Sequence, residues 1–211
     1  MSPDEILQQV AAEAAVCTRC ALHFSRKKAV PGEGPANAAI MFIGEGPGFY
    51  ENEQGRPFVG AAGKFLEELL EKIGMKREQV FIGNVVKCRP PSNRDPLPEE
   101  LAACSPYLDR QIQAINPKVI VTLGRYSMAR FLPNAKISDV HGQSFKVQGR
   151  LIVPMFHPAA ALHQPSLRPA VEQDFARLPG LIAQANAAAA PMVNQDEPSE
   201  PKKEPKQLSL F

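Results

Sequence analysis

The strongest constraint on the fold of this chain is the regular alternation of short apolar runs with amphipathic segments. Four stretches have the composition of buried β-strands, and glycine, proline or polar residues bound them: AAIMFIGEG, QVFIGNVVKC, KVIVTLG and SFKVQGRLIVPMFHP. Strands that alternate with helices form a mostly parallel sheet, because each connection between parallel strands has to cross a face of it. The pattern therefore predicts a three-layer α/β/α sandwich around a mostly parallel, four-stranded central sheet.

The segments between these runs repeat their apolar residues with the period of a helix. Helices are expected over residues 3–16, 60–74, 98–117, 125–132 and 167–184. Pro106 lies inside the third of them, where proline starts or breaks a turn. Residues 144–158 indicate a pair of strands that ends in an irregular loop.

Composition limits the organisation and location of the chain. Its 211 residues, 44% hydrophobic and 22% charged, suit one globular domain of residues 1–186. Residues 187–211 are rich in alanine, proline and charge, which predicts a disordered tail. The N-terminus MSPDEILQQV has no signal-peptide pattern, and no apolar run approaches the ~18 residues of a membrane span. We expect a monomeric cytoplasmic protein with reduced thiols.

Polar and aromatic residues gather where the predicted strands end, which is where ligands bind in sheets of this kind. The loop GEGPG follows the first strand, Asn84 lies on the second, His157 follows the last, and Phe58 lies in a loop. The glycine loop matches neither the dinucleotide fingerprint nor the phosphate-binding loop. An aromatic face, an amide and an imidazole beside a carboxylate are the groups that hold a flat heterocycle.

The cysteines form one close pair, Cys17 and Cys20, and one widely spaced pair, Cys88 and Cys104. They suit four unrelated buried thiols, a zinc site or a [4Fe–4S] cluster. A thioredoxin-like redox pair fits less well, because that motif follows a strand and here it follows a helix. Spacing alone favours a metal centre without separating iron–sulfur from zinc.

Several of these motifs together resemble one enzyme family. GEGPG…GRPFVG, GNVVKCRPP, the four cysteines and FHPAAAL resemble the iron–sulfur uracil-DNA glycosylases, called family 4, from about Ile6 to Leu178. The resemblance implies the fold of the uracil-DNA glycosylases and a [4Fe–4S] cluster on Cys17, Cys20, Cys88 and Cys104. It also implies an enzyme that excises uracil from DNA and leaves the backbone uncut.

The resemblance further implies roles for individual residues. Phe58 stacks on the uracil ring, Asn84 reads the N3–H and O4 edge, and His157 stabilises the anion that develops at O2. Glu51 is the candidate that excludes the methyl group of thymine, and Glu45 the candidate that orients the attacking water. The uracil-binding set is then Glu45, Gly46, Pro47, Glu51, Phe58, Asn84 and His157.

The segment between Cys88 and Cys104 contains RPPSNRD, a mixed polar and basic stretch that could touch phosphates. A sister group captures DNA covalently through a histidine in a basic insert here. The insert is absent from this chain, so ordinary turnover is expected.

Three other functions remain open from the sequence. A glycosylase with a wider base preference, such as one for deaminated purines, would carry similar motifs. A DNA-binding accessory factor would keep the fold, although it would not need Phe58, Asn84 and His157. A nucleotide-binding metabolic domain would have a phosphate loop that can be recognised.

The last five residues, QLSLF, form an apolar motif at the end of a polar tether. They resemble the pentapeptide with which bacterial replication and repair proteins bind the sliding clamp. The resemblance predicts an enzyme of bacterial type whose Gln207 makes a polar contact. Its apolar anchors would be Leu208, Leu210 and Phe211.

Overall fold

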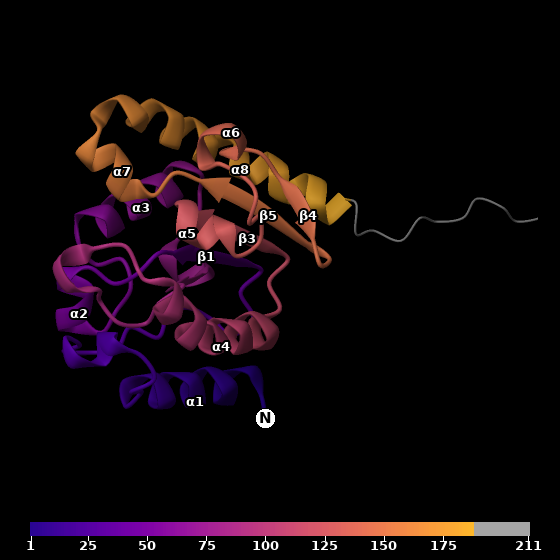
Figure 1. The fold of residues 1–211 in the computed structure, drawn as a ribbon. Coiled ribbons are helices and arrows are strands. Elements are labelled where there is room, and N and C mark those ends of the chain that lie inside the picture. The colour runs from indigo at the N-terminus through magenta and orange to yellow at the C-terminus, as the bar shows by residue number, and fades with distance from the viewer. Residues whose placement is uncertain (188–211) are drawn as a thin grey trace, which may run out of the picture.

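A mixed, mostly parallel β-sheet forms the centre of the protein (Figure 1). The structure is a computed structural model, and it describes residues 1–187. The sheet has five strands in the order β2-β1-β3-β5-β4, and all neighbours are parallel except β4 and β5. The strands are β1 (Ile40–Gly44), β2 (Phe81–Asn84), β3 (Val119–Leu123), β4 (Phe145–Val147) and β5 (Arg150–Met155).

The predicted number of four strands is wrong, and the expected strand pair explains why. β4 and β5 form an antiparallel hairpin in which Val147 pairs with Arg150, so the first arm extends the sheet at its edge. The turn between them, Gln148 and Gly149, has positive φ angles of 49° and 79°. Such left-handed two-residue turns match the twist of the strands that they join.

Helices cover both faces of the sheet. They are α1 (Pro3–Ala15), α2 (Phe49–Gln54), α3 (Ala61–Lys72), α4 (Pro98–Ile115), α5 (Arg125–Ala129), α6 (Ile137–Val140), α7 (Pro158–His163) and α8 (Arg168–Ala187). The five predicted helices are all present, and α4 continues through Pro106. The sequence did not indicate α2, α6 and α7, which have four to six residues and show little of a helical period, although it did indicate α5, which is equally short.

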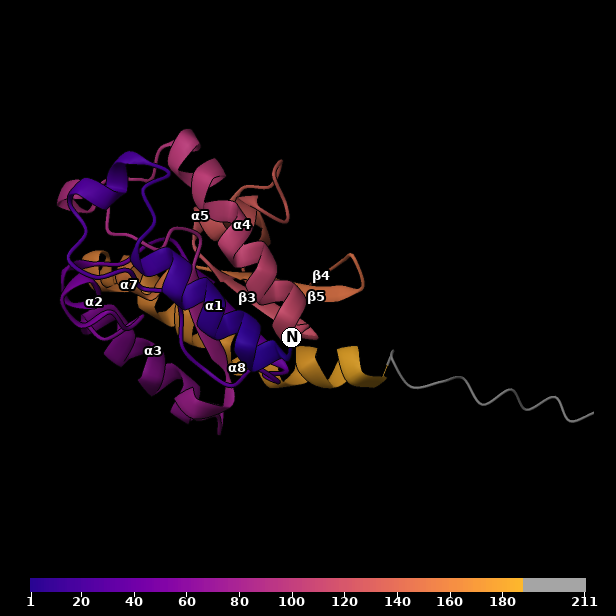
Figure 2. The same ribbon diagram turned by 90° about the horizontal axis from the view of Figure 1, so that it is seen from below.

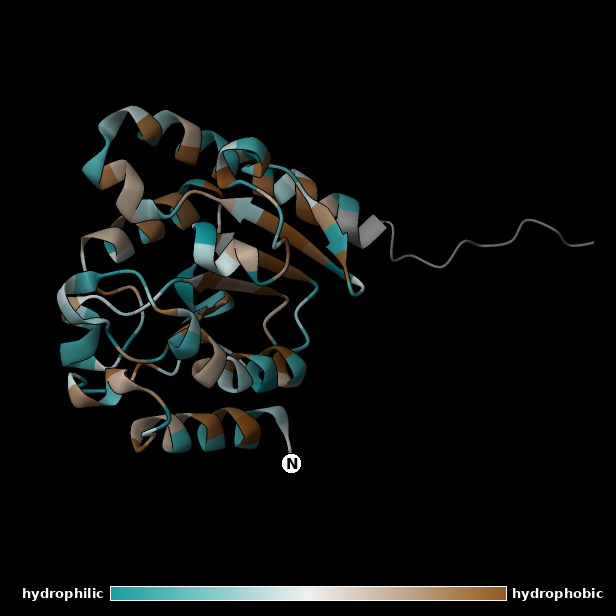
Figure 3. Cartoon of the chain, viewed as in Figure 1, coloured by the Kyte–Doolittle hydropathy of each residue, from teal (hydrophilic) through white to brown (hydrophobic). Residues whose placement is uncertain are grey.

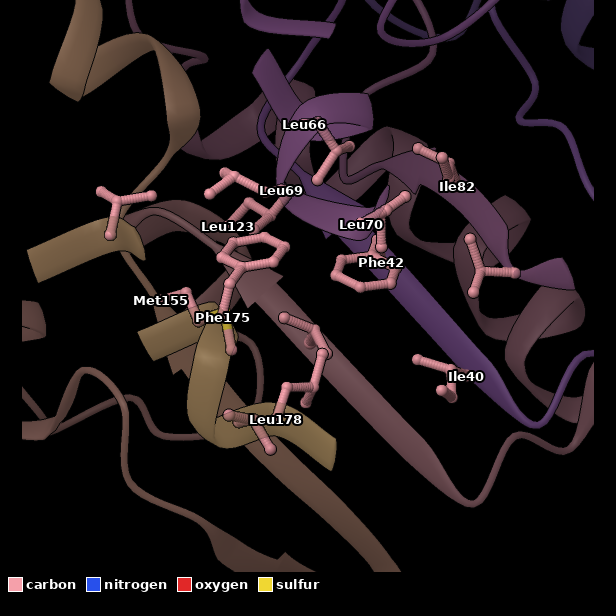
Figure 4. Close-up of a cluster of buried hydrophobic side chains, with 14 of the residues drawn as sticks. Ile40, Phe42, Leu66, Leu69, Leu70, Ile82, Leu123, Met155, Phe175 and Leu178 are labelled. Carbon is pink, nitrogen blue, oxygen red and sulfur yellow. The ribbon is translucent and has the colours of Figure 1, made fainter. Parts of the chain in front are cut away.

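The alternation of side chains along the strands divides the core between the two faces. Phe42 packs with residues of α3 and α8, such as Leu66 and Phe175 (Figure 4). Its neighbour Met41 packs on the opposite face with residues of α4, such as Leu108. Figure 3 shows the central strands largely in brown, the hydrophobic colour, whereas teal marks part of the edge strand β4 and alternates with brown along the helices. This burial on both faces is the arrangement that the continuous apolar runs predict.

The helix α1 packs outside α4, as both ribbon views show (Figures 1 and 2). Val10 and Ala14 of α1 are buried in a small cluster that also contains Cys88, Cys104 and Tyr107. Arg110 of α4 donates a hydrogen bond to the Glu13 carboxylate at 2.6 Å. The end of α1 is therefore held against the part of α4 that carries Cys104.

No helix within residues 1–187 is both long and apolar enough to cross a membrane.

Candidate functional site

The carboxyl ends of β1, β2 and β5 surround a cavity of about 360 Å³, which we call the strand-end cavity. All seven residues that the sequence suggested for uracil binding line it: Glu45, Gly46, Pro47, Glu51, Phe58, Asn84 and His157. The remaining lining residues are Gly48, Ala62, Pro90, Asn93, Arg94, Ala159 and His163. The parallel sheet brings together side chains that are more than a hundred residues apart in sequence.

The floor of the strand-end cavity requires a glycine at the end of β1. Gly44 pairs in register with Asn84 of β2. A Cβ atom on Gly44 would lie 2.5 Å from Asn84 Oδ1 and 2.7 Å from Phe58 Cζ, which is too close for any real contact. The absence of a side chain therefore lets the Asn84 amide and the Phe58 ring approach each other over the end of β1.

Asn84 lines the strand-end cavity and has an unused hydrogen-bond acceptor. The residue is 2% exposed, and its Oδ1 atom is buried without a hydrogen-bond partner among residues 1–187. Buried amide oxygens are usually paired, because a lost hydrogen bond to water costs about 1–3 kcal/mol. An unpaired acceptor in a lined cavity is therefore a candidate for contact with a ligand.

The Phe58 ring lies beside the imidazole of His157, with ring centroids 5.4 Å apart and an angle of 23° between the planes. Phe58 is buried and has a φ angle of 52°, a left-handed conformation that is unfavourable for a residue with a bulky side chain. The loop therefore has to hold the backbone in this conformation for the ring to form a wall of the cavity.

His157 caps the N-terminus of α7 with its own ring. Its Nδ1 atom accepts a hydrogen bond from the Ala159 backbone N–H at 3.1 Å. Burial lowers the pKa of His157 to about 4, although the charge of Glu51 acts in the opposite direction. The ring is therefore neutral near pH 7. Because Nδ1 accepts, the single ring proton is on Nε2.

Two carboxylates of the strand-end cavity have different surroundings. Burial raises the pKa of Glu45, the charge of Asp95 raises it further, and the charge of Arg125 lowers it. Glu51 instead accepts two backbone hydrogen bonds, from the N–H groups of Val59 and Gly60, both at 2.9 Å. Within residues 1–187 no hydrogen bond occupies the Glu45 carboxylate, whereas one oxygen of Glu51 already holds the loop that follows Phe58.

Asn93 and Arg94 bring part of the segment between Cys88 and Cys104 to the strand-end cavity. Both belong to the stretch RPPSNRD, so the sequence indicated the segment but not which of its residues reach the cavity. The Arg94 guanidinium makes two hydrogen bonds to the buried Glu100 carboxylate, at 2.8 and 2.6 Å. A fixed cation at this edge can attract a phosphate group.

The four cysteines line a second cavity, which we call the cysteine cavity. Cys17 and Cys20 follow α1, and Cys104 lies on α4. Three N–H groups donate to their sulfur atoms: Arg19 N to Cys17 at 3.5 Å, Lys87 N to Cys104 at 3.2 Å and Arg26 Nη1 to Cys88 at 3.5 Å. Within residues 1–187, no three cysteine, histidine, aspartate or glutamate side chains are grouped as ligands of a single metal ion.

Two of the four thiols in the cysteine cavity, Cys88 and Cys104, need a nearby cation in order to ionise near neutral pH. Burial raises the pKa of Cys88, and it raises that of Cys104 to about 11. Burial also opposes ionisation of Cys17, but hydrogen bonds from Tyr107 and Arg19 outweigh it and lower the pKa of that thiol. Four sulfur donors are the ligand set that iron–sulfur clusters share with zinc, and either metal would stabilise thiolates. The donor set therefore fits such a group.

Lys87 connects the two cavities and was not identified from the sequence. Its ammonium group is buried and donates to the backbone oxygen of Asn84 at 2.9 Å and to Gln111 Oε1 at 2.7 Å. Burial lowers the pKa of Lys87 to about 8. Within an apolar stretch such as NVVKC, a buried lysine leaves no pattern that distinguishes it from an exposed one.

The chain matches the family described as the uracil DNA glycosylase superfamily over residues 31–178, which include all residues of the strand-end cavity. It is 50% identical over 182 residues to the type-4 uracil-DNA glycosylase of Sulfurisphaera tokodaii, covering 82% of this chain and 83% of that protein. It is 45% identical over 184 residues to the type-4 uracil-DNA glycosylase of Thermotoga maritima, covering 85% and 96%. With the type-5 uracil-DNA glycosylase of Pyrobaculum aerophilum it shares 29% identity over 148 residues, covering 62% and 65%.

Proposed function

The chain belongs to the uracil-DNA glycosylase superfamily and to its type-4 members, and from this we propose how its own residues carry out the reaction. The enzyme hydrolyses the N-glycosidic bond of uracil in DNA, which leaves an abasic site and initiates base excision repair. The base has to leave the stack before it can be reached, at a cost of a few kcal/mol. The strand-end cavity is the site that would receive it.

Recognition of uracil would depend on Asn84, and its buried, unpartnered Oδ1 atom is the observation that carries this proposal. A carboxamide can accept a hydrogen bond from uracil N3–H and donate one to O4 at the same time. Cytosine presents the reversed pattern and would leave both amide groups unpaired, which can discriminate by ~10⁴-fold. The Phe58 ring would stack on the flat base and fix its plane.

His157 would stabilise the departing uracil. Breaking the glycosidic bond places negative charge on the base, and a neutral imidazole with its proton on Nε2 can donate a hydrogen bond to O2. Because the pKa of His157 is about 4, the ring does not need to lose a proton before it acts at neutral pH. A hydrogen-bond donor aimed at the developing charge lowers the barrier to excision by about 3–4 kcal/mol.

Glu45 would orient the water that attacks the sugar. It lines the strand-end cavity beside the turn Gly46–Pro47. A carboxylate with a raised pKa is a stronger base than an ordinary one, and its negative charge also favours a sugar that becomes positive. Gly46 occupies the position where the best-known uracil glycosylases have an aspartate, so we assign the water to Glu45.

Glu51 would exclude thymine by shape. It lines the strand-end cavity, and its bonds to Val59 and Gly60 restrict its movement. A side chain that cannot move aside would collide with the 5-methyl group, which is the one difference between thymine and uracil.

The four cysteines would hold a [4Fe–4S] cluster with a structural role. Such a cluster supplies iron–thiolate bonds that cross-link the segments carrying its ligands. Here Cys17 and Cys20 follow α1, whereas Cys88 and Cys104 bound the segment that contributes Asn93 and Arg94 to the strand-end cavity. Ordering this segment would order one edge of the cavity.

The C-terminal motif Gln207, Leu208, Leu210 and Phe211 lies outside the described residues, and its proposed role depends on the sequence. We assign residues 1–186 to a monomeric, cytoplasmic catalytic domain and residues 187–211 to a tether that binds the bacterial sliding clamp. Deletion of residues 207–211 should abolish binding to purified clamp and leave excision from short oligonucleotides unchanged. Clamp binding by the truncated protein at full strength would contradict the assignment.

The cavity assignment is tested with oligonucleotides that contain one modified base each, followed by alkaline cleavage of abasic sites. The wild-type enzyme should release uracil and leave thymine and cytosine in place, and Asn84→Ala should lose most uracil release. Asn84→Asp should accept cytosine better, because a protonated carboxyl can meet its reversed edge. The matched control Asn93→Ala changes another asparagine of the cavity and should retain preference for uracil. Comparable release of hypoxanthine would support a wider base preference.

A further inference from the structure

The Phe58 ring, which forms one wall of the strand-end cavity, belongs to a loop whose backbone is held by side chains. Four consecutive residues of this loop each have one backbone polar group hydrogen-bonded to a side chain. Residues 57–60 form this loop between α2 and α3. On one side, the Glu51 carboxylate accepts hydrogen bonds from the N–H groups of Val59 and Gly60. The preceding carbonyl groups, of Pro57 and Phe58, point to a different side chain.

That side chain is Arg77, which comes from the short helical turn before β2. Its Nη1 atom donates to the Phe58 carbonyl at 3.0 Å, and its Nη2 atom donates to the Pro57 carbonyl. Nη1 also contacts the Glu67 carboxylate at 3.2 Å, and Nε lies 3.8 Å from Glu33. The Arg77 side chain is only 10% exposed, so the guanidinium is enclosed by the loop that it holds.

The contacts of Arg77 coincide with the unfavourable backbone conformation of Phe58. This residue has a φ angle of 52°, and such a conformation persists only where its surroundings hold it. The first turn of α3 presses on the same peptide group, because a Cβ atom on Gly63 would lie 1.9 Å from the Phe58 oxygen. Two parallel N–H donors of one planar guanidinium are suited to hold two successive carbonyl groups.

We infer that Arg77 is a positioning residue of the enzyme, which holds the left-handed Phe58 backbone and so turns the ring toward the flipped base. Arg77 is not among the described residues that line the strand-end cavity, and it would not touch the base. The inference rests on the stacking role proposed for Phe58. In this inference two side chains hold the loop in the geometry that stacking needs. Arg77 donates hydrogen bonds to the carbonyl groups, and Glu51 accepts hydrogen bonds from the amides.

The test is a double-mutant cycle of Arg77→Lys and Phe58→Ala, measured as single-turnover excision of uracil and as thermal stability. Lysine keeps the charge and the aliphatic stem but cannot hold two carbonyl groups in one plane. In the wild-type background we expect excision to slow by about 10- to 100-fold, the cost of a misplaced catalytic or binding group. In the Phe58→Ala background the same substitution should slow excision by less than about twofold, because no ring remains to be positioned.

The control is Arg56→Lys. Like Arg77, Arg56 lies near the Glu33 carboxylate, but it does so at the surface and makes no hydrogen bond to the backbone of residues 57–60. It should leave excision within about twofold of wild type. Equal slowing by Arg77→Lys in both backgrounds would show a general structural role and overturn the inference. Wild-type excision by Arg77→Lys, with Phe58→Ala impaired, would overturn the inference alone. Undiminished excision by Phe58→Ala would also overturn the proposed stacking role.

Discussion

The strand-end cavity takes its polar side chains mainly from the ends of β1, β2 and β5. The cysteine cavity takes its four cysteines from the segment that follows α1, from the segment that follows β2, and from α4. In the strand-end cavity, hydrogen bonds to the backbone already determine the orientation and protonation of functional side chains. The Ala159 N–H, for example, determines the tautomer of His157. In the cysteine cavity, buried thiols with raised pKa values require a metal to become ligands.

This difference predicts that the strand-end cavity mainly serves excision and that the cysteine cavity mainly serves stability. Substitutions of polar residues in the strand-end cavity should affect excision more than folding, because the fold holds this cavity without a bound group; substitution of Phe58, which also belongs to the core, should affect both. Substitutions in the cysteine cavity should affect folding first, and excision only as a consequence. Four measurements test this division.

The largest effect is expected from the cysteine cavity. Cys104→Ala should lose the brown colour and the broad absorption near ~400 nm of a cluster held by thiolates. Loss of a structural metal removes several kcal/mol of folding free energy, so the melting temperature should fall by more than about 10 °C. The neighbouring Ser105→Ala is the control and should keep colour and stability. Colourless wild-type protein with stoichiometric zinc would contradict the iron–sulfur proposal, but it would not contradict the assignment as a glycosylase.

The next largest effect is expected from His157. His157→Ala should lower the rate of excision by about 10²–10³-fold, because the hydrogen bond to departing uracil forms mainly in the transition state. DNA binding should change little, whereas the melting temperature should fall modestly, because the ring also caps the N-terminus of α7. The exposed His163→Ala, in the same cavity, should retain most of the rate. A His157→Ala protein that unfolds on purification would show that the strand-end cavity also supports the fold.

A smaller effect is expected from the ionisation of Glu45. Burial raises the pKa of this carboxyl, so the rate should begin to fall at a higher pH than for an ordinary glutamate as the solution is acidified. Glu45→Gln should be slower by about 10- to 100-fold and should lack this acid limb. The neutral form of His157 persists down to about pH 4, so its titration lies further toward acid. An unchanged acid limb in Glu45→Gln would remove the water-orienting role.

The smallest effect is expected from Lys87, which should be the exception to the division. Lys87→Met leaves the Asn84 carbonyl and Gln111 without their donor, at a cost of about 1–3 kcal/mol. Because Asn84 is the residue proposed to read the base and Lys87 precedes Cys88, both the excision rate and the melting temperature should decrease modestly. Thermal melting and single-turnover excision of the same preparation measure the two effects. A change in only one of them would show that the two cavities are independent.

The sequence predicted much of the layout, because strand and helix periods are local properties of the chain. The carboxyl ends of parallel strands meet at one edge, so the alternating pattern of the chain is enough to place the ends of β1, β2 and β5 together. The seven predicted residues of the strand-end cavity follow from that rule and from the resemblance of their motifs. The sequence indicated the pair of strands that became β4 and β5, but not that β4 extends the central sheet, because whether a hairpin arm joins a sheet depends on the neighbour that receives it.

The tertiary structure alone decided how these residues are held. No local pattern indicates that Phe58 adopts a positive φ angle, that Arg77 holds its carbonyl group, or that Lys87 is buried beneath Asn84. Each depends on contacts between segments that are distant in sequence. A side chain's partners are set by the packing of these segments, whereas its chemical type is set by the sequence. The sequence therefore determined which groups the enzyme has, and the fold determined their conformation, tautomer and charge.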